Sequence, residues 1–222
     1  MARQLTLPLP PKVAFGADDF FVSSANAAAH AMLLGPAPWP EGKLALVGPS
    51  GSGKSHLARV WQTECDARII DAKDRSALDQ QPEAGARLVV EGVEHLPRAA
   101  EEPLFHLHNR LARVGGQLLL TSDRAPSRWN IALPDLASRL QATSVVRIED
   151  PDDRLLEAVL AKHFSDRQIP IGPDLLPYLL WRMERSFAAA AEIVAQLDDR
   201  ALGERRPVTR ALARRILEER DG

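Results

Sequence analysis

The residues with the clearest chemistry form one run, Gly48-Pro49-Ser50-Gly51-Ser52-Gly53-Lys54-Ser55. This run fits the phosphate-loop pattern G-x-x-x-x-G-K-[ST] at every position. Its glycines let successive backbone N–H groups point into one concavity, and a helix starting near Lys54 adds its positive end. We expect Lys54 to bind the β- and γ-phosphates of a nucleotide and the Ser55 hydroxyl to bind Mg²⁺. The alternative, a glycine-rich turn with an incidental lysine, is disfavoured because an apolar strand precedes the run and a helical stripe follows it.

An acidic strand end is the expected partner of such a loop. The apolar run Leu88-Val89-Val90 leads into Glu91, which is placed to serve the metal ion. The next residue is Gly92, which has no side chain for acid–base chemistry, and whether the carboxylate of Glu94 reaches the site is left open. Glu91 could instead cap an exposed strand end. We therefore expect nucleotide binding with slow hydrolysis or none.

A second polar strand end follows Leu118-Leu119-Leu120. A polar group at the tip of such a strand commonly lies beside the γ-phosphate or the attacking water, and Ser122 or Asp123 could fill this role. An ordinary strand-to-turn transition, with Asp123 as a cap, is equally compatible with the sequence.

Short apolar runs alternating with helical stripes must position these groups. Expected strands lie near residues 44–47, 67–70, 87–90, 117–121 and 144–148, and expected helices near 27–34, 55–64 and 103–113, with Ser24 or Asn26 capping the first helix. This alternation predicts an α/β fold with a five-stranded parallel sheet covered by helices on both faces.

The strands stop near Asp150, and four amphipathic stripes follow, starting near residues 155, 176, 187 and 207. They predict a small all-helical domain. We expect an extended tail at 1–12, where prolines exclude a helix, an α/β domain at 13–150 and the helical domain at 151–222.

Composition excludes several classes of protein. The 28 basic and 30 acidic residues give a formal charge of −2, which argues against a protein whose main role is to bind nucleic acid backbones. The single cysteine, Cys65, excludes an internal disulfide framework and a multi-cysteine metal site. No apolar run approaches the length of a membrane span, and the proline-broken N-terminus is not that of a secretory signal.

Three segments together resemble the AAA+ module of the DnaA/Hda family of bacterial replication proteins. They are residues 48–57, in which His56 and Leu57 extend the phosphate loop, Leu-Thr-Ser-Asp-Arg-Ala-Pro at 120–126 and Asp-Leu-Ala-Ser-Arg-Leu at 135–140. The resemblance runs from about Phe20 to Glu219. It implies the P-loop AAA+ form of the α/β fold with a helical lid, a cytoplasmic bacterial protein, and a bound adenine nucleotide, ADP or ATP, with Mg²⁺.

The resemblance also assigns residue roles. It implies that Arg139 is an arginine finger acting in trans on a neighbouring subunit's nucleotide. Asn26 matches a position near the adenine, and His56 belongs to the nucleotide-binding run. The family's second arginine, which touches the phosphates, would fall on Ala188 or Ala189, and Arg185 is near but not aligned. With Gly92, this departure predicts weak or absent hydrolysis by the chain itself.

The tail adds a second motif, Gln4-Leu5-Thr6-Leu7-Pro8-Leu9. It resembles the peptide by which proteins dock on the bacterial sliding clamp: Leu5, Leu7 and Leu9 would be apolar anchors, Gln4 would hydrogen bond, and Pro8 would keep the segment extended. The alternative is that these leucines pack on the protein's own core. The family match implies a regulator with the clamp and DnaA as partners, weak or indirect DNA contact, no membrane, and a possible homo-oligomer. The competing interpretation is a self-acting ATPase that loads a helicase or DNA.

Overall fold

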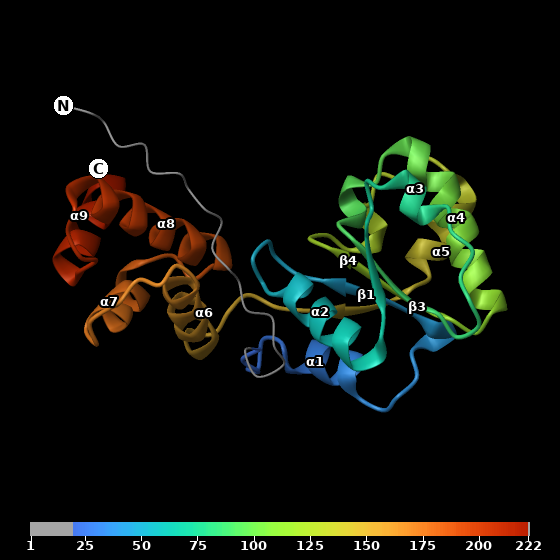
Figure 1. Ribbon diagram of the computed structural model, residues 1–222, viewed down its shortest axis with the longest axis horizontal. Coiled ribbons are helices and arrows are strands. Elements are labelled where there is room, and N and C mark those ends of the chain that lie inside the picture. The colour runs from blue at the N-terminus through green and yellow to red at the C-terminus, as the bar shows by residue number, and fades with distance from the viewer. Residues whose placement is uncertain (1–19, 222) are drawn as a thin grey trace.

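The computed structural model describes residues 20–221, which form a parallel sheet followed by a group of C-terminal helices (Figure 1). The strands are β1 (Lys43–Val47), β2 (Arg68–Asp71), β3 (Arg87–Glu91), β4 (Gln117–Ser122) and β5 (Ser144–Arg147). The helices of the first part are α1 (Ala27–Leu34), α2 (Lys54–Cys65), α3 (Arg75–Leu78), α4 (Arg98–Arg113) and α5 (Pro134–Gln141). The C-terminal helices are α6 (Asp153–Asp166), α7 (Leu175–Arg182), α8 (Phe187–Glu204) and α9 (Arg210–Asp221).

All the strand pairs are parallel, and the order across the sheet is β2-β3-β4-β1-β5. Because the strands point the same way, their carboxyl ends lie along one edge of the sheet. The phosphate-loop run leaves β1 at this edge, and Glu91 and Ser122 end β3 and β4 there. The central position of β4 places Ser122 between the loop and Glu91.

Alternate residues of the three central strands, β1, β3 and β4, enter two separate cores. One contains Ala45, Val90 and Leu120 with residues of α3, α4 and α5; the other contains Leu46, Val89 and Leu119 with residues of α1 and α2. Both faces are therefore buried, and the prediction of a parallel sheet covered by helices on both faces is confirmed. The lid-like group of C-terminal helices is confirmed as well, and α6 to α9 enclose their own core.

Several local predictions differ from the structure. Helix α4 begins at Arg98, five residues before Pro103, and the short helices α3 and α5 were missed. Asn26 holds the position before α1, but its side chain does not cap the helix. Strand β5 ends at Arg147, one residue short of the predicted end, and α9 starts at Arg210, three residues late.

Among the helices of residues 20–221, none is both long enough and apolar enough to cross a bilayer.

Candidate functional site: a phosphate loop at the carboxyl edge of the sheet

The phosphate-loop run forms a tight turn between β1 and α2. Gly51 and Gly53 have φ angles of 78° and 91°, a region that side-chain-bearing residues rarely adopt. Gly53 is the N-cap of α2, so the first N–H groups of this 12-residue helix face the loop. The Gly48 N–H donates to the Ser122 carbonyl at 3.2 Å, which fixes the loop to the tip of β4.

Lys54 lies inside this turn. Its Nζ donates to the carbonyl oxygens of Gly48 at 2.7 Å and Pro49 at 2.8 Å. Burial lowers the pKa of Lys54, and the nearby carboxylates of Glu94, Asp123 and Glu91 partly oppose this shift. The structure thus places three acidic residues within electrostatic reach of Lys54, and one of them is Glu94, which the sequence left open.

Two carboxylates here have oxygens suited to a metal ion. Oε1 of Glu91 and Oε2 of Glu94 are buried, and neither has a hydrogen-bond partner among the described residues. Buried polar atoms normally have partners, so such oxygens are candidates to face a cation or water. Residues 20–221 contain no cluster of three or more acidic, His or Cys residues that could hold a metal ion alone. Glu91 and Ser55 would therefore bind Mg²⁺ together with phosphate oxygens of the nucleotide, which is the usual arrangement for this ion.

Ser122 has a structural task that the sequence did not reveal. Its Oγ accepts hydrogen bonds from the Trp129 indole at 2.8 Å and from the Arg124 N–H at 3.1 Å, and the residue is almost fully buried. Asp123 is more exposed: its carboxylate pairs with Arg124 at 3.2 Å, and its N–H donates to Glu94 at 3.3 Å. Of the two candidates, Asp123 is the one whose charge acts on Lys54.

A cavity of about 890 Å³ adjoins the loop. It is lined by loop residues including Ser50, Ser52, Ser55 and His56, by Phe20, Val22 and Asn26, and by Leu155, Val159, Lys162 and His163 of α6. The Phe20 ring stacks on His30 and meets the His56 ring edge-on. The lining combines apolar side chains with the cation Lys54 of the loop, which suits a molecule that carries a flat ring and a polyphosphate.

Asn26 lines this cavity, but both ends of its amide bind the backbone. Nδ2 donates to the Phe21 carbonyl and Oδ1 accepts from the Ser23 N–H, each at 2.8 Å. The side chain therefore holds the 20–23 segment in place, which gives Asn26 a positioning role in forming the cavity wall. Phe20 and the α6 residues were not identified from the sequence, because no local motif marks a wall that forms only when α6 packs across the loop.

Arg139 lies on α5, exposed and away from this cavity. Its guanidinium sits 5.5 Å from the centre of the Phe105 ring. Burial lowers the pKa of Lys43, and the charge of Arg139 adds to this shift. Lys43 opens β1, whereas the loop leaves β1 after Val47, about 13 Å further along at ~3.3 Å per residue. Figure 1 likewise shows α5 on the side of the sheet remote from the C-terminal helices. The structure does not bring Arg139 together with the loop of its own chain.

The start of α8 contacts the phosphate loop. The Cβ of Phe187 lies 3.3 Å from the position that a Cβ on Gly51 would occupy. Ala188 and Ala189 follow in the first turn, so this helix end offers backbone groups and no cation. Arg185 is exposed and paired with Asp153 at 2.7 Å. The tail motif Gln4 to Leu9 lies outside the described residues.

No protein-family profile matches the chain. Among solved structures, domain III of the Thermotoga maritima replication initiation protein DnaA superposes with a TM-score of 0.75 at 19% identity, over 96% of this chain and 98% of that one. AMPPCP-bound DnaA from Aquifex aeolicus gives a TM-score of 0.62 at 20% identity, over 86% and 66% of the two chains. The Thermotoga maritima RuvB Holliday junction branch migration motor gives 0.58 at 17% identity, over 87% and 66%.

These similarities define the class of fold. The strand order, the phosphate loop after β1 and the lid-like helices are those of an AAA+ module, and this part of the sequence prediction is confirmed. The chain spans about two thirds of the length of the longer DnaA and RuvB chains.

Proposed function

We propose that the chain is an Hda-type regulator of replication initiation. In this proposal it binds ADP or ATP with Mg²⁺ and docks on the DNA-loaded sliding clamp through Gln4 to Leu9. It then stimulates hydrolysis of ATP bound to DnaA, so that the initiator becomes inactive and re-initiation is prevented. Nucleotide binding is supported by the cavity beside the loop and by the fold shared with a DnaA that binds AMPPCP.

The observation that carries the regulatory part is the position of Arg139. An exposed arginine remote from its own phosphate loop is free to meet the nucleotide of a neighbouring subunit. An arginine supplied in trans stabilises charge on the transferring phosphate and is worth about 10³–10⁵ in rate in the best-studied cases. A regulator of this kind needs no efficient hydrolytic site of its own, which agrees with Gly92 and with alanines at 188 and 189.

The test is hydrolysis of DnaA-bound ATP in a single turnover, with clamp loaded on DNA. We expect the wild-type chain to accelerate the reaction and Arg139→Ala to lose at least tenfold of the acceleration while binding ADP normally. Arg98→Ala, at an exposed arginine of α4, is the matched control. If Arg139→Ala and the wild type accelerate hydrolysis equally, Arg139 is not an arginine finger. The chain would then be a nucleotide-stabilised adaptor that binds DnaA without affecting hydrolysis.

The clamp contact has its own test. Removing residues 1–9 should abolish co-elution with the clamp and leave the unfolding temperature unchanged. Co-elution that survives the deletion would show that another surface makes the contact.

One observation favours the alternative of a self-acting ATPase. Glu91 and Glu94 each have a buried oxygen without a hydrogen-bond partner among the described residues, and both carboxylates act on Lys54, an arrangement suited to activating water. Phosphate release by the isolated chain separates the two functions: rapid turnover, lost in Glu94→Gln, would indicate a loader, and negligible release the regulator.

A further inference from the structure

A separate hollow, of about 710 Å³, lies at the amino edge of the sheet, where β1, β3 and β4 begin. Its lining includes Glu41, Lys43, Arg87, Ala112 and Gln117, and we call it the amino-edge hollow. It shares no residue with the cavity beside the phosphate loop, which adjoins the carboxyl edge of the same sheet. Any ligand that it binds would therefore occupy a second site.

Lys43 is the buried cation of the amino-edge hollow. Its side chain is 7% exposed, whereas that of its acidic neighbour Glu41 is 86% exposed, and Oε2 of Glu41 lies 3.9 Å from Nζ, beyond hydrogen-bond distance. Nζ donates only a long bond, of 3.5 Å, to the Glu41 carbonyl. Buried charges normally have a close, hydrogen-bonded counter-ion, so the charge of Lys43 is weakly compensated by the chain itself.

Arg87 adds a second positive charge to the lining. Its Nε donates to Oε1 of Gln117 and its Nη1 to the Cys65 carbonyl, each at 3.0 Å. Both acceptors are neutral, so these bonds orient the guanidinium without cancelling its charge. Two cations against the solvated carboxylate of Glu41 leave the lining positive, although the chain as a whole carries a formal charge of −2.

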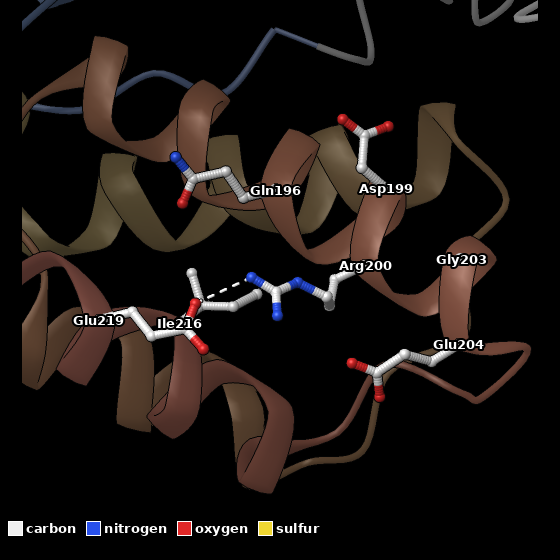
Figure 2. A pocket seen from close by; sticks show the side chains of 7 residues that line it. All are labelled: Gln196, Asp199, Arg200, Gly203, Glu204, Ile216 and Glu219. Atoms are coloured by element: carbon white, nitrogen blue, oxygen red, sulfur yellow. Dashed lines mark hydrogen bonds and ion pairs between the residues drawn. The ribbon is translucent and has the colours of Figure 1, made fainter.

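The groove between α8 and α9 provides a contrast. Figure 2 shows Arg200 reaching across it to Glu219, with a hydrogen bond of 2.8 Å. A second ion pair, Arg215 with Glu204, joins the same two helices. In that groove each of these arginines meets a carboxylate of the chain at hydrogen-bond distance, which is the partner that Lys43 lacks.

A buried histidine within electrostatic reach of Lys43 has unused hydrogen-bonding groups. His108 and Ala112 are four residues apart on α4 and so lie on one side of the helix, and Ala112 lines the amino-edge hollow. His108 is 3% exposed, and neither ring nitrogen has a hydrogen-bond partner among residues 20–221. Burial lowers the pKa of His108 to about 4, and the charges of Lys43 and Arg139 add to this shift. Because buried polar atoms normally have partners, this ring is available to a ligand that enters beside Lys43.

We propose that the amino-edge hollow binds a phosphate group, with Lys43 as its main cation and Arg87 and His108 as further hydrogen-bond donors. A phosphate oxygen beside Lys43 would be the close counter-ion that Glu41 does not supply, and the remaining oxygens could accept from the other two side chains. A phosphate dianion compensates both cations of the lining, whereas a carboxylate compensates one. The inference depends on neither the phosphate loop nor the proposed regulatory function.

The test uses the full chain carrying Lys54→Ala as the parent, because the phosphate loop would otherwise bind the same probe. Inorganic phosphate is titrated at constant ionic strength and about pH 8, where it is mainly the dianion, and binding is followed by calorimetry and by the nitrogen resonances of the His108 ring. We expect saturable binding that shifts these resonances. Lys43→Met should weaken it by about tenfold or more, since a hydrogen bond to a charged group is worth at least a decade in affinity. Lys73→Met, at an exposed lysine outside the hollow, is the matched control and should bind phosphate as the parent does.

Stability measurements separate a binding role of Lys43 from a structural one. Because Lys43→Met removes a weakly compensated buried charge, its unfolding temperature without phosphate should equal or exceed that of the parent. Phosphate should raise the unfolding temperature of the parent and leave that of Lys43→Met unchanged. His108→Phe tests the same site without altering Lys43: it keeps a ring in the core, so it should fold normally and bind phosphate more weakly.

Three results would overturn the inference. They are the absence of saturable phosphate binding, equal phosphate affinity of the parent and Lys43→Met, and an equal response to acetate, which would indicate an unselective positive surface. Phenyl phosphate, as a second probe, distinguishes the two sources of a phosphate group. Tighter binding than inorganic phosphate would identify a phosphomonoester as the ligand, and weaker binding would identify free phosphate.

Discussion

At the scale of single residues, a cluster of basic groups forms at the sheet edge opposite the phosphate loop. His108 of α4 is 3% exposed, and neither of its ring nitrogens has a hydrogen-bond partner among the described residues. Burial, with the nearby charges of Lys43 and Arg139, lowers the pKa of His108 to about 4. The folded protein therefore holds this imidazole neutral, and Arg139 is the exposed cation of the cluster.

This depressed pKa predicts a loss of stability in mild acid. In the unfolded chain His108 takes up a proton near pH 6.5, and in the folded chain only near pH 4, so the stabilisation is complete above 6.5 and is lost as the pH falls toward 4. Between pH 7 and pH 5 the expected cost is about 2 kcal/mol. Urea unfolding at the two pH values should show a smaller loss for His108→Leu, although His163, whose pKa burial also lowers, keeps part of the dependence. Identical losses in variant and wild type would contradict the assignment.

The positions of single residues follow from the sequence where the motif is local. The phosphate loop is contiguous, and its eight residues lie in the turn that the pattern predicts. Ser122 and Asn26 were identified by position, but their hydrogen bonds to Trp129 and Phe21 depend on folded segments that no spacing rule describes. The acidic pair Glu91 and Glu94 is an intermediate case, because the short 3₁₀ turn Val93–His95 decides where Glu94 points.

At the scale of elements, α5 is held by a buried carboxylate of α4. The side chain of Glu101 accepts hydrogen bonds from the N–H groups of Ala132, at 3.0 Å, and Leu133, at 2.7 Å, directly before α5 begins at Pro134. No side chain caps α5 from its own N-cap residue, Leu133. Glu101 thus fixes the start of the helix that carries Arg139.

We expect Glu101→Gln to lower the free energy of unfolding by about 1–3 kcal/mol, because charge-assisted bonds to buried N–H groups are weakened. If α5 presents the finger, the same variant also reduces stimulation of DnaA-bound ATP hydrolysis while ADP affinity is unchanged. Glu102→Gln is the control, since Glu102 is adjacent in sequence but 80% exposed. Equal destabilisation by the two variants, measured by urea unfolding, would refute this role of Glu101.

The same two helices show why element boundaries were harder to predict than element types. Pro103 reads as a helix start, but α4 runs through it from Arg98. Pro103 has no N–H to donate to the carbonyl of Ala99, four residues earlier. Ala99 is an exposed residue of the first helical turn, so water can bind this carbonyl instead. Helix α5 has only eight residues, too few for a strong periodic signal, so its position is set mainly by Glu101 and by Leu136 and Leu140 in the core.

At the scale of the whole molecule, the C-terminal helices are joined to the sheet through the site. Leu155 of α6 and Phe187 of α8 are buried in the core that α1 and α2 form against the sheet. Phe187 also touches the phosphate loop at Gly51, and α6 supplies one wall of the adjoining cavity. A ligand in that cavity would therefore contact both parts of the molecule, so its binding should stabilise them together.

Hydrogen exchange with and without ADP tests this coupling. Free ADP at a hundred times its dissociation constant adds about 2.7 kcal/mol to the free energy of unfolding. The slowly exchanging amides in all parts of the molecule should therefore gain protection. We expect added local protection at residues 48–56 and also in α6 and in the first turn of α8, which are distant in sequence but border the loop and its cavity. Lys54→Ala, which removes the cation of the phosphate loop, should eliminate both effects, whereas Lys73→Ala, at an exposed lysine outside the cavity, should leave them intact. Protection confined to the loop, with α6 and α8 unchanged, would show that the nucleotide contacts the sheet alone and that the C-terminal helices move independently of it.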